Sequence, residues 1–238
     1  MASPNARDPP CHSLVAEVQE GSKAVLPPMA IVWACRSSVD AYAAQGRSVE
    51  VPQASCPTCT AVMSPWSGYW RFVREAGRCH HVFVVRGCCQ ACRRTHALLP
   101  AFLVRNRLDV AETIGAVLEV VNARRTGVRP AAKLAEVPHT TARGWVRYFA
   151  LNASRLAVGF AALCVELGGE LGAGADCSAR GALAAIDAAW NVAAGLPGWL
   201  AVGRWRFCSA VCGGSLIALN TNSPYLVVGR RRFMPPVP

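Results

Sequence analysis

The pattern of hydrophobic and polar positions changes several times along the chain, and each change predicts a new element. Residues 1–28 are rich in proline and show no period, which is typical of a flexible leader. The pattern then predicts a strand at 29–35, a helix at 37–46 that Gly46 ends, and an edge strand at 47–55.

Two β-rich runs come next, 'GYWRFV' at 68–73 and 'HHVFVV' at 80–85. The connection between them, 'REAGRC', is short and contains a glycine. Alternating runs joined in this way predict a β-hairpin.

The pattern becomes helical after this hairpin. Residues 108–127 place Val110, Ile114, Val117, Leu118 and Val121 on one apolar stripe, and Gly127 can end that helix. Shorter helices are predicted at 130–137 and 140–152, the first of them opening with Pro130. Alanine-rich helices follow residue 153, with a glycine-rich break at 168–175 and another helix near 181–194.

These elements predict an α+β fold in which a small zinc-ribbon β-hairpin module precedes a mainly α-helical helix-turn-helix region and an Ala-rich C-terminal region. The expected division is a flexible leader (1–28), a strand and helix with the zinc ribbon (29–104), a helix-turn-helix (105–153), and an Ala-rich helical region with a basic tail (154–238).

Charge adds a class of partner to this picture. The formal net charge is +11, and eleven of the basic residues lie between residues 86 and 147. Such clustering favours polyanions, and double-stranded DNA is the partner that we expect. No small-molecule substrate is expected, and the DNA-binding form could be a monomer or a homodimer.

A membrane location is not expected from the two most apolar stretches. Residues 156–175 contain Glu166 and Glu170, and residues 181–203 contain Asp187. Charges near the middle of a membrane span are costly.

The sequence also indicates the cellular compartment. The N-terminal residues lack a basic start followed by an apolar core, and Cys35 and Cys164 sit singly in apolar surroundings. These features predict free thiols in a reducing cytoplasm and a nucleoid-associated location.

The cysteines carry the most specific chemistry. Cys56 and Cys59 form one C-x-x-C pair, and Cys89 and Cys92 form a second pair beyond the hairpin. Two such turns supply four thiolates to a tetrahedral Zn²⁺, so we predict a structural zinc site. Buried free thiols or a redox pair are the alternatives. Other residues could replace a ligand: Cys79, His80, His81, Cys88 and His96.

Neighbouring arginines bear on these thiols. Arg86, Arg93 and Arg94 surround the second pair, and we expect their positive charges to lower the thiol pKa values and so favour thiolate ligands.

Residues 129–149 have the pattern of a helix-turn-helix, with Glu136 where the turn commonly has glycine, which predicts a looser or differently shaped turn. On the second helix Ala142, Trp145, Val146 and Phe149 form a packing face. The opposite face would contact DNA through Thr140, Thr141, Arg143, Gly144 and Arg147, and a terminal run would grip phosphates through Arg230, Arg231 and Arg232. A helical bundle with solvated arginines is the alternative.

Several of these segments resemble an uncharacterised bacterial family with a transposase-like zinc ribbon and a helix-turn-helix. The resemblance is carried by 'CPTC', 'GYWRFV', 'RGCCQACRRTHALLP' and 'TTARGWVRYF', and it covers residues 29–150. The segment 'GGSLIALNTNSPYLVVGRRRFMPP' is similar to that family's C-terminal signature. The resemblance implies DNA association, often beside mobile elements.

Catalysis is not expected. A transposase of the insertion-sequence kind cuts DNA with three carboxylates that hold two metal ions. After residue 153 the chain offers Glu166, Glu170, Asp176 and Asp187, close together on helical or glycine-rich sequence. We therefore predict a zinc-stabilised, sequence-specific DNA-binding protein without a complete nuclease domain. A transposase-derived enzyme and a zinc-dependent protein-interaction adaptor are the alternatives.

Overall fold

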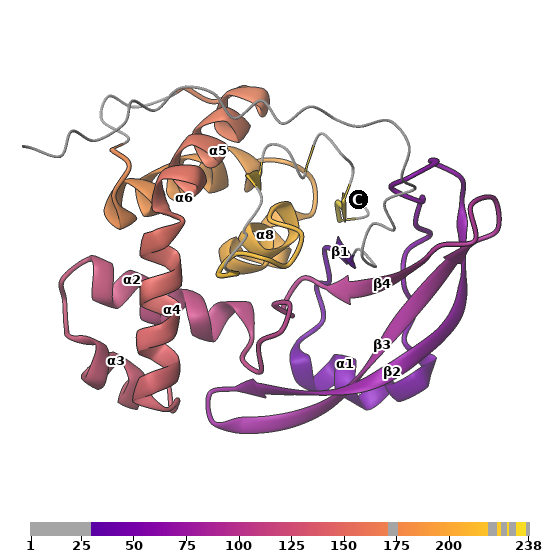
Figure 1. The fold of residues 1–238 in the computed structure, drawn as a ribbon, viewed down its shortest axis with the longest axis horizontal. Helices are drawn as coiled ribbons and strands as arrows, with labels where there is room; N and C mark the ends of the chain where they lie inside the picture. The colour runs from indigo at the N-terminus through magenta and orange to yellow at the C-terminus, as the bar shows by residue number, and fades with distance from the viewer. Residues whose placement is uncertain (1–29, 171–175, 219–222, 225–227, 229–231, 237–238) are drawn as a thin grey trace, which may run out of the picture.

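A computed structural model describes residues 30–170, 176–218, 223–224, 228 and 232–236. The fold is mixed α+β, as the sequence predicts, with a five-stranded sheet and eight α-helices in this part of the chain. Figure 1 shows the sheet on one side of the molecule, most of the helices on the other, and α8 (Arg204–Val211) between them.

The sheet has the strand order β2-β3-β4-β1-β5. Its strands are β1 (Ala30–Trp33), β2 (Met63–Glu75), β3 (Arg78–Cys89), β4 (Thr95–Pro100) and β5 (Phe233–Met234). Strand β3 is antiparallel to β2 and β4, whereas β1 runs parallel to β4 and β5. The chain therefore brings its described C-terminal residues back beside its first described strand.

The predicted hairpin forms from β2 and β3, and it is longer than the two β-rich runs. The turn is tight, because Ala76 and Gly77 connect Glu75 directly to Arg78 with φ angles of 44° and 76°. Two successive left-handed residues match the right-handed twist of the strands that they join.

The predicted edge strand at 47–55 is wrong. Gly46–Ser48 form a 3₁₀ turn, and the following residues are irregular up to an isolated bridge between Ser55 and Val62. Pro52 lies in this segment and has no N–H to donate to a ladder.

The first four α-helices are α1 (Val39–Gln45), α2 (Ala111–Asn122), α3 (Val128–Leu134) and α4 (His139–Leu151). The next three are α5 (Ala153–Glu166), α6 (Ala179–Ala193) and α7 (Trp199–Val202). Helices α2, α3 and α4 pack against one another, and α5 packs against α6. The expected helices at 108–127, 130–137, 140–152 and 181–194 thus all form, with shifted ends.

Helix α8 joins the sheet to the helices. All of its residues after Arg204 are buried, and it contacts α2, α6, β1 and β5. The Arg206 guanidinium donates to the carbonyls of Cys35 and Ser37, at 3.0 and 2.6 Å, and pairs with the carboxylate of Glu112 on α2. One hydrophobic core consequently runs from the sheet into the helices.

The domain boundaries predicted at 104 and 153 stay predictions, because contacts of this kind occur both within and between domains. The predicted leader, 1–28, lies outside the described residues.

Within the described ranges, no single helix is long and apolar enough to cross a membrane. One pair, α4 with α5, passes that test when taken together, and the two helices are bent by 64° relative to each other.

Candidate metal centre and basic surface

The two C-x-x-C pairs form backbone turns of the same shape. In the first, Thr60 N donates to Cys56 O at 2.8 Å and Cys56 N donates to Ala61 O at 2.8 Å. In the second, Arg93 N donates to Cys89 O at 2.8 Å and Cys89 N donates to Arg94 O at 2.9 Å. The residue after each second cysteine is left-handed, with a φ of 62° at Thr60 and 58° at Arg93.

The four sulfurs of these turns point at a common centre. Cys56 Sγ lies 3.5 Å from Cys92 Sγ, and Cys59 Sγ lies 3.4 Å from Cys89 Sγ. All four ligand atoms lie within 4.8 Å of one another. A tetrahedral ion with metal–sulfur bonds of about 2.3 Å places its sulfurs about 3.8 Å apart. The four cysteines can therefore hold a metal ion.

Backbone amides decide which thiols ionise most readily. The N–H of Cys92 donates to the Cys89 sulfur and is the main reason that the pKa of Cys89 falls to about 7. Burial raises the pKa of Cys56, but the N–H groups of Thr58 and Cys59 outweigh burial, so its pKa is lowered. The arginines that were predicted to lower the thiol pKa values are thus not the main cause of the lowered pKa at Cys56 and Cys89.

The other two thiols have raised pKa values. The Arg94 amide lowers the pKa of Cys92, but burial and the neighbouring thiols outweigh it and raise the pKa to about 12. The Ala61 amide lowers the pKa of Cys59, but the Cys89 thiol, burial and the Cys56 thiol together outweigh it, so this pKa is also raised. Each close sulfur pair thus joins a thiolate-favouring and a thiol-favouring cysteine, and a cation would allow all four to ionise.

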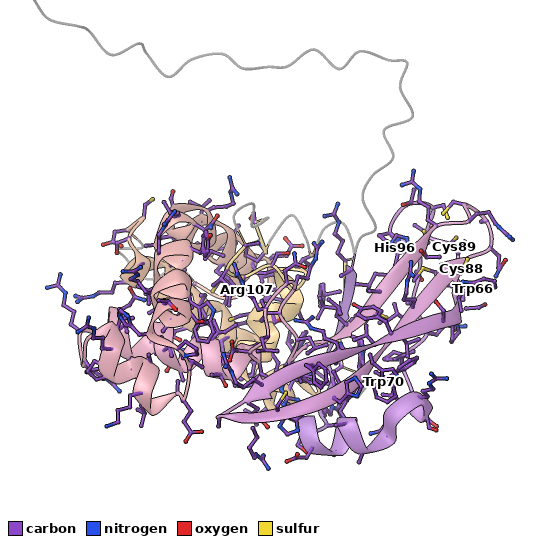
Figure 2. All side chains as sticks on the ribbon, turned by 60° about the horizontal axis from the view of Figure 1, so that its bottom comes forward. Trp66, Trp70, Cys88, Cys89, His96 and Arg107 are labelled. Carbon is purple, nitrogen blue, oxygen red and sulfur yellow. The ribbon has the colours of Figure 1, made fainter. Side chains whose placement is uncertain are left out.

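The predicted substitute ligands lie outside this quartet. Cys88 is buried, and its thiol donates to the Cys89 carbonyl at 3.9 Å. His96 comes closest, with Nε2 at 3.8 Å from Cys56 Sγ, so it is a neighbour of one sulfur. Figure 2 shows Cys88, Cys89 and His96 together at the end of the sheet away from the helices.

The remaining candidates lie near the opposite end of the hairpin. His80 Nδ1 is 3.1 Å from an Asp40 carboxylate oxygen. His81 stacks against Trp70 and Phe72, with ring centroids 4.6 Å from each. Cys79 is paired across the hairpin with Arg74, in the second residue pair from the Ala76–Gly77 turn, and is exposed. Both histidines therefore lie away from the cysteine quartet.

Helices α2, α3 and α4 form a compact three-helix unit. Ala142, Trp145 and Phe149 are buried on one face of α4, as their spacing predicts. Between α3 and α4, Glu136 has a φ of 53°, the left-handed conformation that glycine commonly supplies there. The predicted loosening of this turn is therefore not observed, and Val137 N closes it by donating to Ala132 O at 3.0 Å.

The opposite face of α4 carries the residues predicted to contact DNA. Thr140, Arg143 and Arg147 are exposed, and Thr141 and Gly144 are half-buried. A methyl group added at Gly144 would meet nothing within 4 Å. The structure thus leaves this face open to a partner.

The terminal arginines are only partly described. Arg230 and Arg231 lie outside the described residues. Arg232 is half-buried next to β5, and its carbonyl accepts a hydrogen bond from Val32 N at 3.2 Å.

Sequence reasoning overlooked an exposed aromatic row on the hairpin. Trp66 and Phe72 are 69% and 59% exposed, and Trp70 stacks beside Phe72 through His81. Figure 2 shows Trp66 and Trp70 along the same hairpin. The signal in the sequence is the alternation of aromatic residues in 'PWSGYWRF'. This alternation does not show whether the aromatic face is buried or exposed, because both faces of a sheet have the same period.

The late carboxylates have local partners. The Asp176 carboxylate accepts hydrogen bonds from the Ser178 amide and hydroxyl, which lowers its pKa. Asp187 pairs with Arg204, and burial raises its pKa. In the described part of the chain, the four cysteines are the group of His, Cys, Asp and Glu residues placed to share a metal ion.

Fold and site together define a mixed α+β chain with a four-cysteine centre and a basic three-helix unit. The family model described as Domain of unknown function (DUF6431) matches residues 56–135. This match contains the cysteine quartet, the hairpin, β4, α2 and α3, and ends before α4. The expected similarity to a domain of unknown function is confirmed for this segment, which is shorter than the 29–150 expected. No curated protein and no solved structure matches the chain.

Proposed function

We propose that this protein binds double-stranded DNA sequence-specifically through α4 and that a zinc ion stabilises its hairpin. The observation that carries the proposal is the open face of α4, where exposed Arg143 and Arg147 stand opposite buried Trp145 and Phe149. A helix anchored on one face can enter the major groove with the other, and arginine can form paired hydrogen bonds with guanine.

Zinc is the ion that we propose for the cysteine quartet. Four thiolates in a tetrahedral arrangement favour zinc or an iron–sulfur cluster, and paired C-x-x-C turns are typical of structural zinc. Four protein ligands leave no open coordination position, so the ion would have a structural role. It would tie the irregular segment before β2 to the segment between β3 and β4.

We propose further that the chain is related to transposases by its DNA-binding part and lacks a nuclease. This is supported by the positions of Asp176 and Asp187, which are engaged by Ser178 and Arg204. Supercoiled DNA incubated with the protein and Mg²⁺ or Mn²⁺ should stay uncut. Metal-dependent cleavage that is lost in Asp187→Ala would instead identify a transposase-derived enzyme.

The decisive test is a selection of bound duplexes from a randomised library, carried out with wild type and with Arg143→Ala/Arg147→Ala. Wild type should enrich a defined sequence, and the double variant should not. Arg125→Ala/Arg180→Ala is the matched control, because it removes the same charge from two exposed arginines on another surface. Enrichment of the same sequence by all three proteins would exclude α4 as the reading element.

A protein-interaction adaptor is the second candidate, and the exposed Trp66 and Phe72 favour it. Aromatic residues are enriched at protein interfaces. An adaptor would enrich no DNA sequence, and Trp66→Ser/Phe72→Ser would abolish capture of its partner while the α4 double variant retained it.

A further inference from the structure

A small cavity lined by arginines lies where the hairpin meets β4 and the loop after it. Its polar walls are the side chains of Arg71, Arg86 and Arg105, together with Tyr69, Thr95 and Asn106. Its volume is about 280 Å³. Ala30, Ala97 and Leu99 complete the lining, so no wall is acidic.

The three guanidinium groups have neutral partners. Arg86 donates to Thr95 Oγ1 at 2.8 Å, and Arg105 donates to Ser215 Oγ at 3.4 Å. Arg71 donates to the carbonyls of Val104, at 2.7 Å, and Arg107. Carbonyl and hydroxyl groups satisfy N–H donors but leave the positive charge uncompensated.

No described carboxylate forms an ion pair with the cavity arginines. In the described ranges, the ion pairs join acidic residues to Arg74, Arg78, His80, Arg204 and Arg206, and none involves the three cavity arginines. Burial also lowers the pKa of Arg71, which shows that its environment disfavours the charge. An anion in the cavity would relieve that cost.

The cavity is connected to the face of α4. Arg71 donates to the carbonyl of Arg107, and the Arg107 guanidinium lies 5.2 Å from the centre of the Tyr148 ring. The Arg147 guanidinium lies 5.8 Å from the centre of the same ring. Figure 2 shows Arg107 in the middle of the molecule, between the hairpin and the helices. A row of arginines thus leads from α4 to the cavity.

Size and charge limit what the cavity can hold. Pockets that enclose whole organic ligands measure about 300–1,000 Å³, so this one suits a single oxyanion with water rather than a nucleotide. Planar guanidinium groups pair with phosphate oxygens through two parallel hydrogen bonds. Three of them lining one cavity match the several oxygens of a phosphate group.

We propose that the cavity of Arg71, Arg86 and Arg105 binds one phosphate group, supplied by the backbone of the DNA that α4 contacts. This inference rests on the proposed function for the source of the phosphate. The pocket itself needs only the arginines. A bound backbone phosphate would fix where the duplex lies on the hairpin, and thereby the register of α4 in the groove.

The first experiment is a calorimetric titration of the full-length, metal-loaded protein with inorganic phosphate. Wild type should bind one phosphate per chain, and Arg86→Gln/Arg105→Gln should bind it at least tenfold more weakly. Arg125→Gln/Arg180→Gln, with the same loss of charge, should match wild type. Arg105→Gln alone is the second variant if the double variant has a lowered melting temperature, because Arg105 makes the longest of these hydrogen bonds. Equal phosphate binding by all these proteins would overturn the proposal.

The second experiment identifies the source of the phosphate. Binding to a duplex is measured over a range of salt concentrations, where each phosphate neutralised contributes about 0.9 to the slope. The cavity variant should lose about 0.9 from the slope, and the control should lose nothing. Lost phosphate binding with an unchanged slope would reject DNA as the source and identify a site for free phosphate. If wild type bound no DNA, the proposed function would fail, and the calorimetry would still decide the pocket.

Discussion

Arg143 and Trp145 are two residues apart on α4 but have opposite surroundings. Arg143 is exposed, whereas Trp145 is 2% exposed and lies in the core of the three-helix unit. Loss of a buried indole removes packing from the folded state, while loss of an exposed guanidinium removes only what the guanidinium contacts. Stability and DNA binding can therefore be separated within a single helix.

We expect Arg143→Ala to leave the free energy of unfolding unchanged and to weaken binding at the selected site by about 1–3 kcal/mol, with relaxed preference at one base pair. Trp145→Ala should cost about 3–5 kcal/mol of stability. Denaturant unfolding and duplex titration measure the two effects. A large loss of stability in Arg143→Ala would mean that this side chain supports the fold.

Individual residues were predictable where their role depends on near neighbours. The four cysteines that can hold a metal ion and the buried face of α4 follow from spacing alone. The expectation for Glu136 is wrong because the residue's own conformational preference does not set this turn. A left-handed non-glycine residue costs about 1–2 kcal/mol, and packing of the adjacent Val137 can offset that amount. The cavity of three arginines was not predictable, because Arg71, Arg86 and Arg105 meet only in the folded chain.

At the scale of helices, two glycines inside helical segments have similar sequence contexts but different space around them in the structure. Gly115 lies inside α2, where an added Cβ would be 2.0 Å from the Trp205 ring of α8. Gly144 lies inside α4, where an added Cβ would meet nothing within 4 Å. Gly115 is therefore required for the close approach of two helices, and Gly144 is not required for folding.

Gly115→Ala should destabilise the protein by about 1–3 kcal/mol, because overlap with a buried ring outweighs the better helix propensity of alanine. Gly144→Ala should stabilise it by about 0.5–1 kcal/mol and weaken DNA binding, because a methyl group would stand on the face proposed to enter the groove. Thermal and denaturant unfolding give the first comparison. Stabilisation without weaker binding would show that Gly144 does not approach DNA.

Elements were predictable when their signals are local. The hairpin, α2, α3 and α4 all carry turn residues or an apolar stripe that sequence displays directly. Strands β4 and β5 were missed because they are short, and β5 is in addition defined by a partner far away in the chain, β1. The parallel pairing of β1 with β4 likewise has no local signature.

At the scale of the molecule, the hairpin is held at both ends. The cysteine quartet lies at one end, and near the other Arg74 pairs with Asp109 at 2.6 Å. Between them, the Tyr42 hydroxyl of α1 donates to the Phe83 carbonyl at 2.9 Å. Since the far end is anchored by the core, a metal bound by the quartet would be needed most by the two irregular turns that carry its ligands.

Removal of the metal should therefore loosen the cysteine turns before it unfolds the rest. A metal present at about 1,000 times its Kd stabilises the fold that binds it by about 4 kcal/mol, so chelation should lower the melting temperature. In hydrogen exchange, protection should fall first at residues 54–63 and 88–96, where backbone hydrogen bonds close the turns. Residues of α2 and α4 should keep their protection.

Paired variants connect this behaviour to the quartet. Cys59→Ser removes one of the four sulfurs and should release the metal, with the same exchange pattern as the chelated protein. Cys88→Ser is the matched control, because its sulfur lies next to the quartet in sequence but bonds to the Cys89 carbonyl instead. It should keep one metal per chain by elemental analysis, and zinc should be the element found. Protein purified without chelator that contains no metal, or metal that is lost equally from both variants, would contradict the four-cysteine site. If α4 lost protection together with the turns, the metal would be stabilising the whole molecule, and the anchoring of the hairpin by Asp109 and Tyr42 would be too weak to act alone.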